Sequence, residues 1–183
     1  MKQRYTIAYK GLGPGPHRYD FHAGDDFFAS QEGSGIKEGD VDVEVDLEKK
    51  GSMLSLDVRM DGAVVVPCDR CLEDCRLPVD YRGRLAVKFS EEEHPFEGDI
   101  MWINPADALL DLEQYIYESI VLSLPYRKVH PEDVHGTPLC NPSMLELFRI
   151  VSEDEFEELT AEKPVGDDPR WEKLKGLKNE DDE

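Results

Sequence analysis

Four cysteines are the residues of this chain whose type and spacing best fit a defined chemistry. Cys68 and Cys71 form a C-x-x-C pair, Cys75 follows shortly after, and Cys140 stands alone much later. A C-x-x-C turn brings two thiolates within bonding distance of one tetrahedral ion, and zinc requires about four such ligands. The spacing therefore predicts a zinc site built around Cys68 and Cys71.

The sequence leaves the fourth ligand of this site open. Cys140 is the expected third ligand, and the fourth is Cys75 or a histidine. His130 and His135 precede Cys140 in the pattern H-x4-H-x4-C. A site closed by four protein ligands is structural and not catalytic. It would join the C-x-x-C turn to the carboxyl-terminal half of the chain.

Two other states of the thiols fit the pattern less well. In one, the thiols are reduced and partly buried, which is ordinary for cysteines of a cytosolic protein. In the other, the C-x-x-C pair is a thioredoxin-type redox centre, which requires the start of a helix within a βαβ unit. Because residues 63–68 and 77–89 on either side of the motif are predicted strands, the sequence favours the metal site over redox chemistry.

No other motif selects a catalytic group. The chain contains no G-x-S-x-G, P-loop, G-x-G-x-x-G or H-E-x-x-H pattern. Nothing singles out one pair among the 41 acidic residues for hydrolysis. His17, His22 and His94 lie in predicted polar loops or near strand ends, where surface or packing roles are expected. The sequence predicts a protein that is not an enzyme and has no small-molecule substrate.

The net charge limits the partners of the protein. The 183 residues include 41 Asp and Glu against 21 Lys and Arg, which gives a formal net charge of −20. A surface this acidic repels the phosphates of RNA, which proteins usually meet with a basic patch. Contact with RNA therefore requires a local basic patch, and a basic protein is the more natural partner of the remaining surface.

The acidic charge is unevenly distributed along the chain. Residues 62–90 contain five bases and four acids, whereas residues 152–183 contain 13 acids and five bases. The least acidic regions are the cysteine turn and the loop after the main predicted helix. We expect these regions to contact RNA or an acidic partner, the alternative being local ion pairing with nearby Asp and Glu. The predicted contact residues are Arg70, Arg82, Arg84, Arg127 and Lys128.

Predicted β-strands position the cysteine turn. Residues 41–48 alternate Val or Leu with Asp or Glu, which is typical of a strand with one solvent-exposed face. The alternation continues over residues 54–60, and Asp61-Gly62 predicts a hairpin. The predicted strands span residues 3–10, 18–22, 41–48, 54–60, 63–68, 77–89 and 99–103.

This order of elements predicts an α+β fold. We expect an antiparallel β-meander or partly closed sheet of about six or seven strands, followed by a helical carboxyl-terminal portion. The main helix is predicted over about residues 111–124, and shorter helices follow Asn141, Ser152 and Asp168. These elements predict one β-rich domain over residues 1–150 and an acidic helical tail over residues 151–183.

The location of the protein is predicted from what the sequence does not contain. No apolar stretch follows the amino terminus, so no signal peptide is expected. The apolar runs are too short to span a bilayer. We therefore expect a soluble cytoplasmic protein with no membrane partner.

The cysteine motif also resembles a known family. Cys68-Asp69-Arg70-Cys71-Leu72, together with Tyr19-Asp20-Phe21 upstream and Leu124-Pro125 and Cys140 downstream, resembles the YceD family of bacterial large ribosomal RNA subunit accumulation proteins. The resemblance covers roughly residues 3–142. The ending Asp168-Pro169-Arg170-Trp171 is similar to the tail of Bacteroidetes-type members.

The resemblance implies a non-enzymatic cytoplasmic factor needed for large-subunit (23S) rRNA to accumulate during ribosome assembly. It also implies metal binding, with Cys68, Cys71 and Cys140 at the positions of the family's cysteines. The chain departs from members with several late cysteines, because it has His130 and His135 before Cys140. The expected partner is rRNA or a pre-ribosomal particle. The alternative is an acidic adaptor that binds a basic ribosomal protein without contacting RNA.

Overall fold

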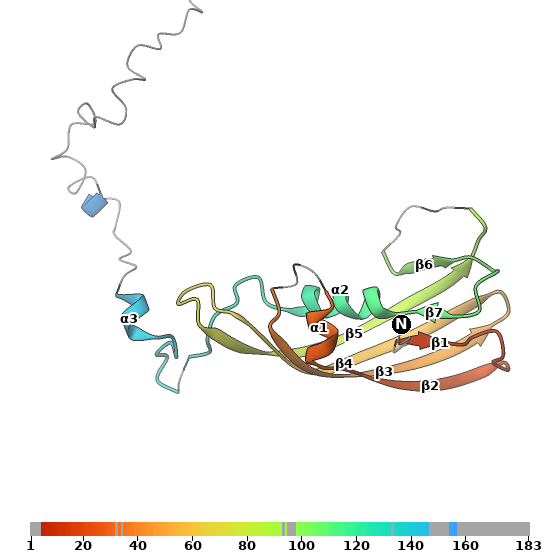
Figure 1. Cartoon of the computed structure of the whole chain (residues 1–183), viewed down its shortest axis with the longest axis horizontal. Coiled ribbons are helices and arrows are strands. Elements are labelled where there is room, and N and C mark those ends of the chain that lie inside the picture. The colour runs from red at the N-terminus through yellow and green to blue at the C-terminus, as the bar shows by residue number, and fades with distance from the viewer. Residues whose placement is uncertain are drawn as a thin grey trace, which may run out of the picture. The chain divides into compact units, whose positions relative to one another are not determined.

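We describe the protein from a computed structural model (Figure 1). The structure describes residues 5–31, 33, 35–92, 94, 98–132, 134–146 and 154–156. The chain divides into two compact units, Met1–Met144 and Leu145–Glu183. The first unit contains all the strands described below and the helices that pack on them.

An open five-stranded sheet, in the order β2-β3-β4-β5-β6, forms the body of the first unit. Strands β2 to β5 are antiparallel to their neighbours, whereas the short β6 runs parallel to β5. A separate antiparallel pair consists of β1 and β7. The strands are β1 Thr6–Ile7, β2 Gly15–Ala23, β3 Glu38–Lys50, β4 Met53–Pro67, β5 Asp74–Phe89, β6 Ile100–Ile103 and β7 Leu110–Asp111.

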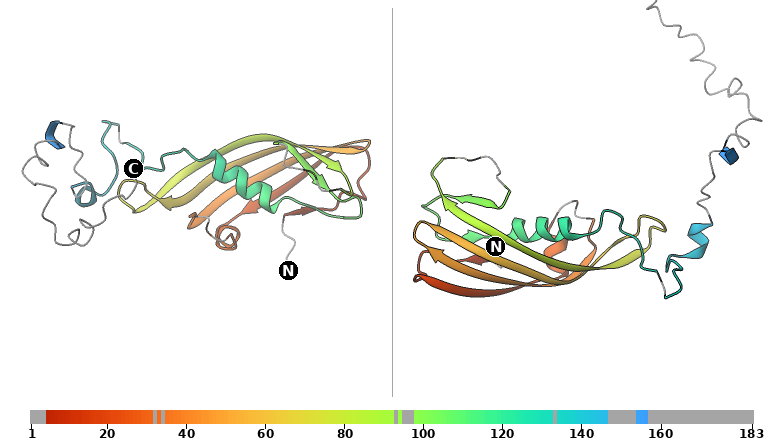
Figure 2. Two further views of the ribbon diagram at one scale, coloured as in Figure 1. Left: turned by 90° about the horizontal axis from the view of Figure 1, so that it is seen from above. Right: turned by 180° about the vertical axis from the view of Figure 1, so that it is seen from behind.

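The helices are short. Helix α1 spans Asp25–Ala29, α2 spans Glu113–Ser123 and α3 spans Pro142–Leu145. Both α1 and α2 lie on the concave face of the curved sheet, and α2 crosses the strands obliquely (Figure 2). The predicted α+β composition is confirmed. None of the helices in the described part of the chain is both long and apolar enough to cross a bilayer.

Period-two alternation gives the sheet one apolar and one charged face. On the concave face Leu47, Leu56 and Leu85 lie in one cross-strand row, and all three are buried. Helix α2 covers this face with Ile116 and Ile120, both 0% exposed. Burial of each such side chain stabilises the fold by about 1.5–3 kcal/mol. The opposite face carries the Asp and Glu residues of β3, and we call it the outer face.

The hairpin predicted at Asp61-Gly62 is wrong, because β4 continues through both residues. A two-residue turn there would place Ala63 on the same face as Met60. In the structure Val64 is the next buried residue after Met60, so the alternation continues unbroken. The run of apolar residues after Gly62 has no polar partner positions, so its sequence alone does not show which face is buried.

Gly62 is required by close backbone approach and not by a turn. It pairs with Val41 of β3, and a Cβ atom at this position would lie 2.2 Å from the carbonyl oxygen of Asp40. We therefore expect Gly62→Ala to lower the free energy of unfolding by about 1–3 kcal/mol, the usual cost of overpacking. Chemical denaturation measures the change. Gly11→Ala is the control, because nothing lies within 4 Å of its added Cβ, and equal stabilities of the two variants would contradict the prediction.

The sheet differs from the predicted one in three further ways. It is not closed, since β2 and β6 are its two edges. Strand β6, predicted at residues 99–103, is parallel to β5 and therefore not part of a meander. The strand predicted over residues 3–10 is reduced to Thr6–Ile7, which pairs with β7 outside the sheet.

The predicted carboxyl-terminal helices are matched in part. Helix α3 begins at Pro142, as the Asn141-Pro142 pair predicts, but it ends at Leu145. Residues 154–156 are helical. The remainder of the acidic tail predicted over residues 151–183 lies outside the described residues. The same is true of the Asp168–Trp171 ending on which the Bacteroidetes-type prediction depends.

Candidate metal centre

The cysteine turn joins the two longest strands of the sheet. Between Pro67, which ends β4, and Asp74, which begins β5, the chain reverses through a short loop. The amide of Cys68 donates to the Glu73 carbonyl at 2.8 Å, and the amide of Leu72 donates to the Cys68 carbonyl at 2.9 Å. Leu72 has a φ of 62°, the one positive φ among the described non-glycine residues. This tight turn buries both cysteines of the C-x-x-C pair.

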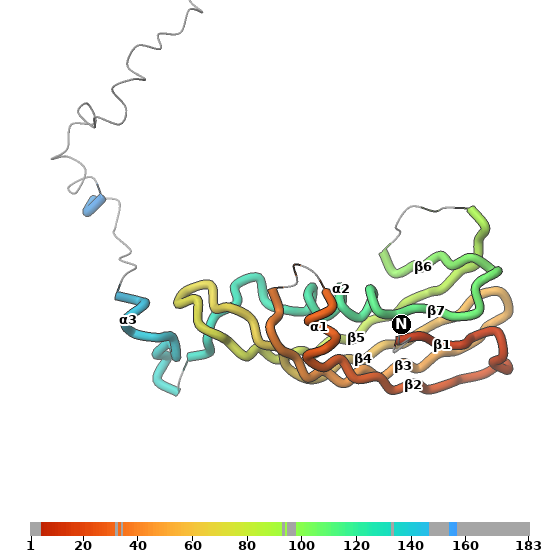
Figure 3. Tube along the Cα trace, in the orientation of Figure 1, coloured from red at the N-terminus to blue at the C-terminus, as the bar shows by residue number. Residues whose placement is uncertain are grey.

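The loop that follows α2 runs beside this turn (Figure 3). The backbone N–H of Lys128 donates to Asp69 Oδ2 at 2.7 Å, and the Asp69 N–H donates to the Lys128 carbonyl at 2.7 Å. Further along, the Leu139 N–H donates to the Pro131 carbonyl at 3.1 Å. These bonds fold residues 128–140 back on themselves, so that both ends of the loop reach the cysteine turn.

Four side chains converge where the turn and the loop meet. The ligand atoms of Cys68, Cys71, His130 and Cys140 all lie within 4.8 Å of one another. We call these four residues the Cys3His cluster. The Sγ atoms of Cys68 and Cys140 are 3.8 Å apart, and Cys71 Sγ lies 3.4 Å from His130 Nδ1. Tetrahedral zinc, with Zn–S of about 2.3 Å and Zn–N of about 2.0–2.1 Å, separates its ligand atoms by about 3.5–3.8 Å. The cluster therefore fits a zinc ion.

The orientation of His130 is suited to metal binding. Its Nε2 lies 3.1 Å from the Asp74 carbonyl oxygen. A carbonyl oxygen only accepts, so Nε2 carries the hydrogen and Nδ1 directs its lone pair toward Cys71. A hydrogen bond from the second ring nitrogen to a backbone carbonyl is the usual support of a metal-binding histidine.

The turn also favours ionisation of one thiol. Burial opposes the thiolate of Cys68, but hydrogen bonds from the backbone of Cys71 and Arg70 and from His130 outweigh it and lower the pKa to about 6. The Arg70 N–H lies 3.4 Å from the Cys68 sulfur. By contrast, burial and the neighbouring thiols of Cys68 and Cys71 raise the pKa of Cys140 to about 11. One thiolate is thus favoured without metal, and a bound cation would favour the others.

The structure discriminates between the ligands that the sequence left open. His130 lies in the Cys3His cluster. Cys75 is buried in β5 opposite Val66, outside the cluster, and burial followed by the charges of Cys68 and Cys71 raises its pKa. His135 is exposed and is likewise outside the cluster. The spacing of five between His130, His135 and Cys140 was the available signal, but it does not say which histidine points inward.

The five predicted contact residues fall into two groups. Arg70, Arg127 and Lys128 adjoin the Cys3His cluster, since Lys128 is bonded to the residue before Arg70. Arg82 and Arg84 lie on the outer face of β5, and at about 3.3 Å per residue Arg82 is roughly 26 Å along the strand from its start. The structure therefore does not bring all five residues into one patch.

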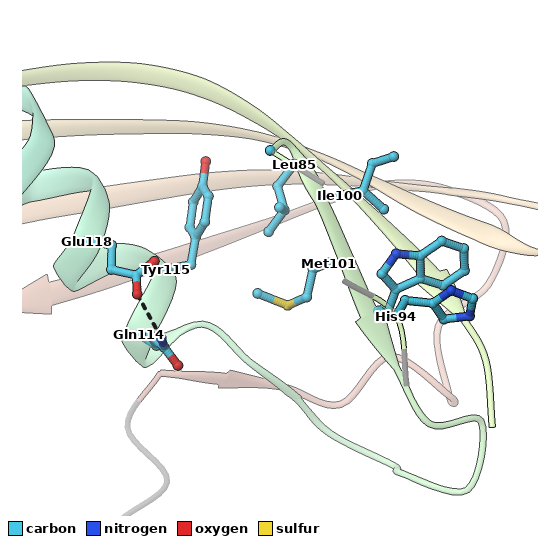
Figure 4. Close-up of a pocket in the computed structure, with 9 residues that line it drawn as sticks. Leu85, His94, Ile100, Met101, Gln114, Tyr115 and Glu118 are labelled. Atoms are coloured by element: carbon cyan, nitrogen blue, oxygen red, sulfur yellow. Dashed lines mark hydrogen bonds between the residues drawn. The ribbon is translucent and has the colours of Figure 1, made fainter. Parts of the chain in front are cut away.

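A separate pocket of about 320 Å³ lies between β6 and the first turns of α2. Figure 4 shows Gln114, Tyr115 and Glu118 of α2 facing Met101 and His94 across it. Its polar groups bond to nearby side chains: Gln114 donates to Glu118 at 2.7 Å, and the hydroxyl of Tyr115 lies 3.0 Å from that of Tyr81. The Cys3His cluster, and not this pocket, has the more clearly defined chemistry.

Comparison with known proteins gives one family. The sequence model of the family described as large ribosomal RNA subunit accumulation protein YceD matches residues 56–178. The match covers about two thirds of the chain and includes all four residues of the Cys3His cluster. No curated protein and no solved structure matches the chain.

Proposed function

We propose, because this chain belongs to the YceD family, that it is a non-enzymatic factor that supports the accumulation of large-subunit (23S) rRNA during ribosome assembly. The family match is the observation that carries the proposal, since the family is described by its effect on this rRNA. The partner we propose is the rRNA or a pre-ribosomal particle, and the location is the cytoplasm.

Within this function, the proposed role of the Cys3His cluster is to fix one end of the β-sheet body. Cys68 and Cys71 belong to the β4–β5 turn, whereas His130 and Cys140 belong to the loop after α2. A bound zinc ion would supply a structural cross-link between the two segments. The cross-link would hold Arg70, Arg127 and Lys128 side by side.

Deleting the gene is expected to lower mature 23S rRNA relative to 16S rRNA. The ratio is measured on total RNA from the deletion strain, from its parent and from the deletion strain carrying the gene on a plasmid. The plasmid should restore the parental ratio. An unchanged ratio in the deletion strain would contradict the proposed function.

A second candidate, the acidic adaptor, is favoured by the outer face of the sheet. Asp42, Asp61 and Asp80 lie in one cross-strand row on β3, β4 and β5. The row ends at His22 of β2, whose Nδ1 lies 3.0 Å from Asp42 Oδ1. Adjacent like charges repel unless a cation approaches, so this row favours a basic protein segment.

Crosslinking in cells separates the two candidates. Purification of the crosslinked protein under denaturing conditions should recover rRNA fragments if the chain contacts rRNA. Recovery of crosslinked protein without rRNA supports the adaptor. The adaptor further requires that binding of the basic partner weakens when Asp61 and Asp80 are replaced by Asn, because both carboxylates are exposed on the outer face.

A further inference from the structure

Exposed apolar side chains gather around the Cys3His cluster. Among the described residues, six large hydrophobic side chains are strongly exposed. Four of them lie within four positions of a cluster residue, which is more than scattered surface exposure would give. These four are Leu72 at 65%, Tyr126 at 99%, Val134 at 96% and Leu139 at 59% exposure.

The cations at this end of the first unit have no carboxylate partners. Within the described part of the chain, no ion pair involves Arg70, Arg127 or Lys128. Elsewhere the arginines of the sheet are paired, as Arg84 is with Asp57 at 2.7 Å. Three positive groups beside an exposed Tyr126 are therefore available to a partner.

The nearby acids are already engaged. Asp69 accepts the N–H of Lys128 at 2.7 Å, Glu73 accepts from the Asn141 side chain at 2.6 Å, and Asp74 pairs with Lys37. The loop geometry thus directs these carboxylates to neighbours other than the three cations. This arrangement gives a small basic site in a chain whose net charge is −20.

We propose that this site binds single-stranded rRNA, with a base stacked on Tyr126 and the adjoining phosphates at Arg70, Arg127 and Lys128. The proposal rests on the proposed function and names the surface that would perform it. Phosphates complement the unpaired cations, and an exposed aromatic ring stacks on any base that is not itself stacked in a duplex. An acidic peptide would satisfy the cations but would leave the ring of Tyr126 without a planar partner.

The charge of the remaining surface favours a short single strand over a duplex. The outer face carries the acidic residues of β3, β4 and β5, so a rigid duplex long enough to cross it would be repelled. Arg82 and Arg84 do not extend the basic site, because they lie along that face near Asp80 and Asp57. The contact is therefore limited to the few nucleotides that reach Tyr126.

Binding of a short single-stranded RNA of mixed sequence to the full-length, zinc-loaded protein tests the proposal. Tyr126→Ala should weaken binding at least about fivefold, as expected for the loss of one stacked base, while Tyr126→Phe should bind normally. Arg127→Ala should weaken binding and reduce its dependence on salt. Arg84→Ala is the matched control and should have no effect. The same RNA annealed to its complement should bind more weakly.

Unchanged binding by Tyr126→Ala, or equal binding of the single strand and the duplex, would overturn the inference. Tyr126 is almost wholly exposed, so its substitution should leave folding and zinc content unchanged. Expression of the variant in the deletion strain separates this failure from failure of the proposed function. A deletion defect that Tyr126→Ala corrects fully overturns the RNA site but leaves the function standing. Absence of any deletion defect overturns the function itself.

Discussion

Protein in which Cys68 is replaced by serine should contain almost no zinc, whereas the unsubstituted chain should contain about one zinc ion per molecule. Cys68 contributes a buried sulfur 3.8 Å from that of Cys140, and its hydrogen bonds favour the thiolate that a metal requires. Elemental analysis of the purified proteins measures the difference. Cys75→Ala is the control, because Cys75 is equally buried but lies outside the Cys3His cluster.

The structural consequence of losing the metal should be local. Residues 128–140 are joined to the cysteine turn by the cluster and a few backbone bonds, while the strands have their own ladders. Hydrogen exchange in Cys68→Ser should therefore accelerate in residues 128–140 and remain slow in β3 and β4. A wild-type protein that contains no metal and has four titratable thiols would show that the cluster is not a zinc site.

Replacing Ile120 by alanine is expected to lower the free energy of unfolding by about 2–5 kcal/mol. Ile120 is 0% exposed and lies on the side of α2 that faces the sheet. Its truncation leaves a cavity that the long strands beneath are unable to collapse around, because each is fixed by its neighbours on both sides. Leu122 is in the same helix but is 82% exposed.

Leu122→Ala is accordingly the matched control, with a change within about 0.5 kcal/mol. Urea unfolding followed by far-ultraviolet circular dichroism measures both variants. Similar losses for the two would mean that α2 does not bury this face against the sheet. A small loss for Ile120→Ala alone would mean that the helix is only loosely attached.

Periodic segments were predictable because one physical signal governs them. Residues 41–48 alternate valine or leucine with acids, and the structure places the apolar set on the concave face and the acids on the outer face. A strand half in water permits few other arrangements. The α+β class followed for the same reason, since the helical periodicity begins only after the strands.

Other features depended on contacts distant in the sequence. Asp61-Gly62 has the composition of a hairpin, but Gly62 is there to admit the backbone of β3, which no local pattern reveals. The parallel pairing of β6 depends on how the chain returns over the sheet. The inclusion of His130 in place of Cys75 is of the same kind, because it depends on where the loop after α2 meets the cysteine turn.

The separation of Cys68 and Cys140 by 72 positions has a consequence for how the protein is made. At about 5–20 residues per second, roughly 4–14 seconds of translation lie between these two cysteines. For that interval the nascent chain exposes a C-x-x-C pair and lacks the ligands that close the coordination sphere. Strands β2 to β5 precede His130 in the chain, so the sheet emerges first and the metal is enclosed last. Capture of zinc would then mark the completion of the first unit during synthesis.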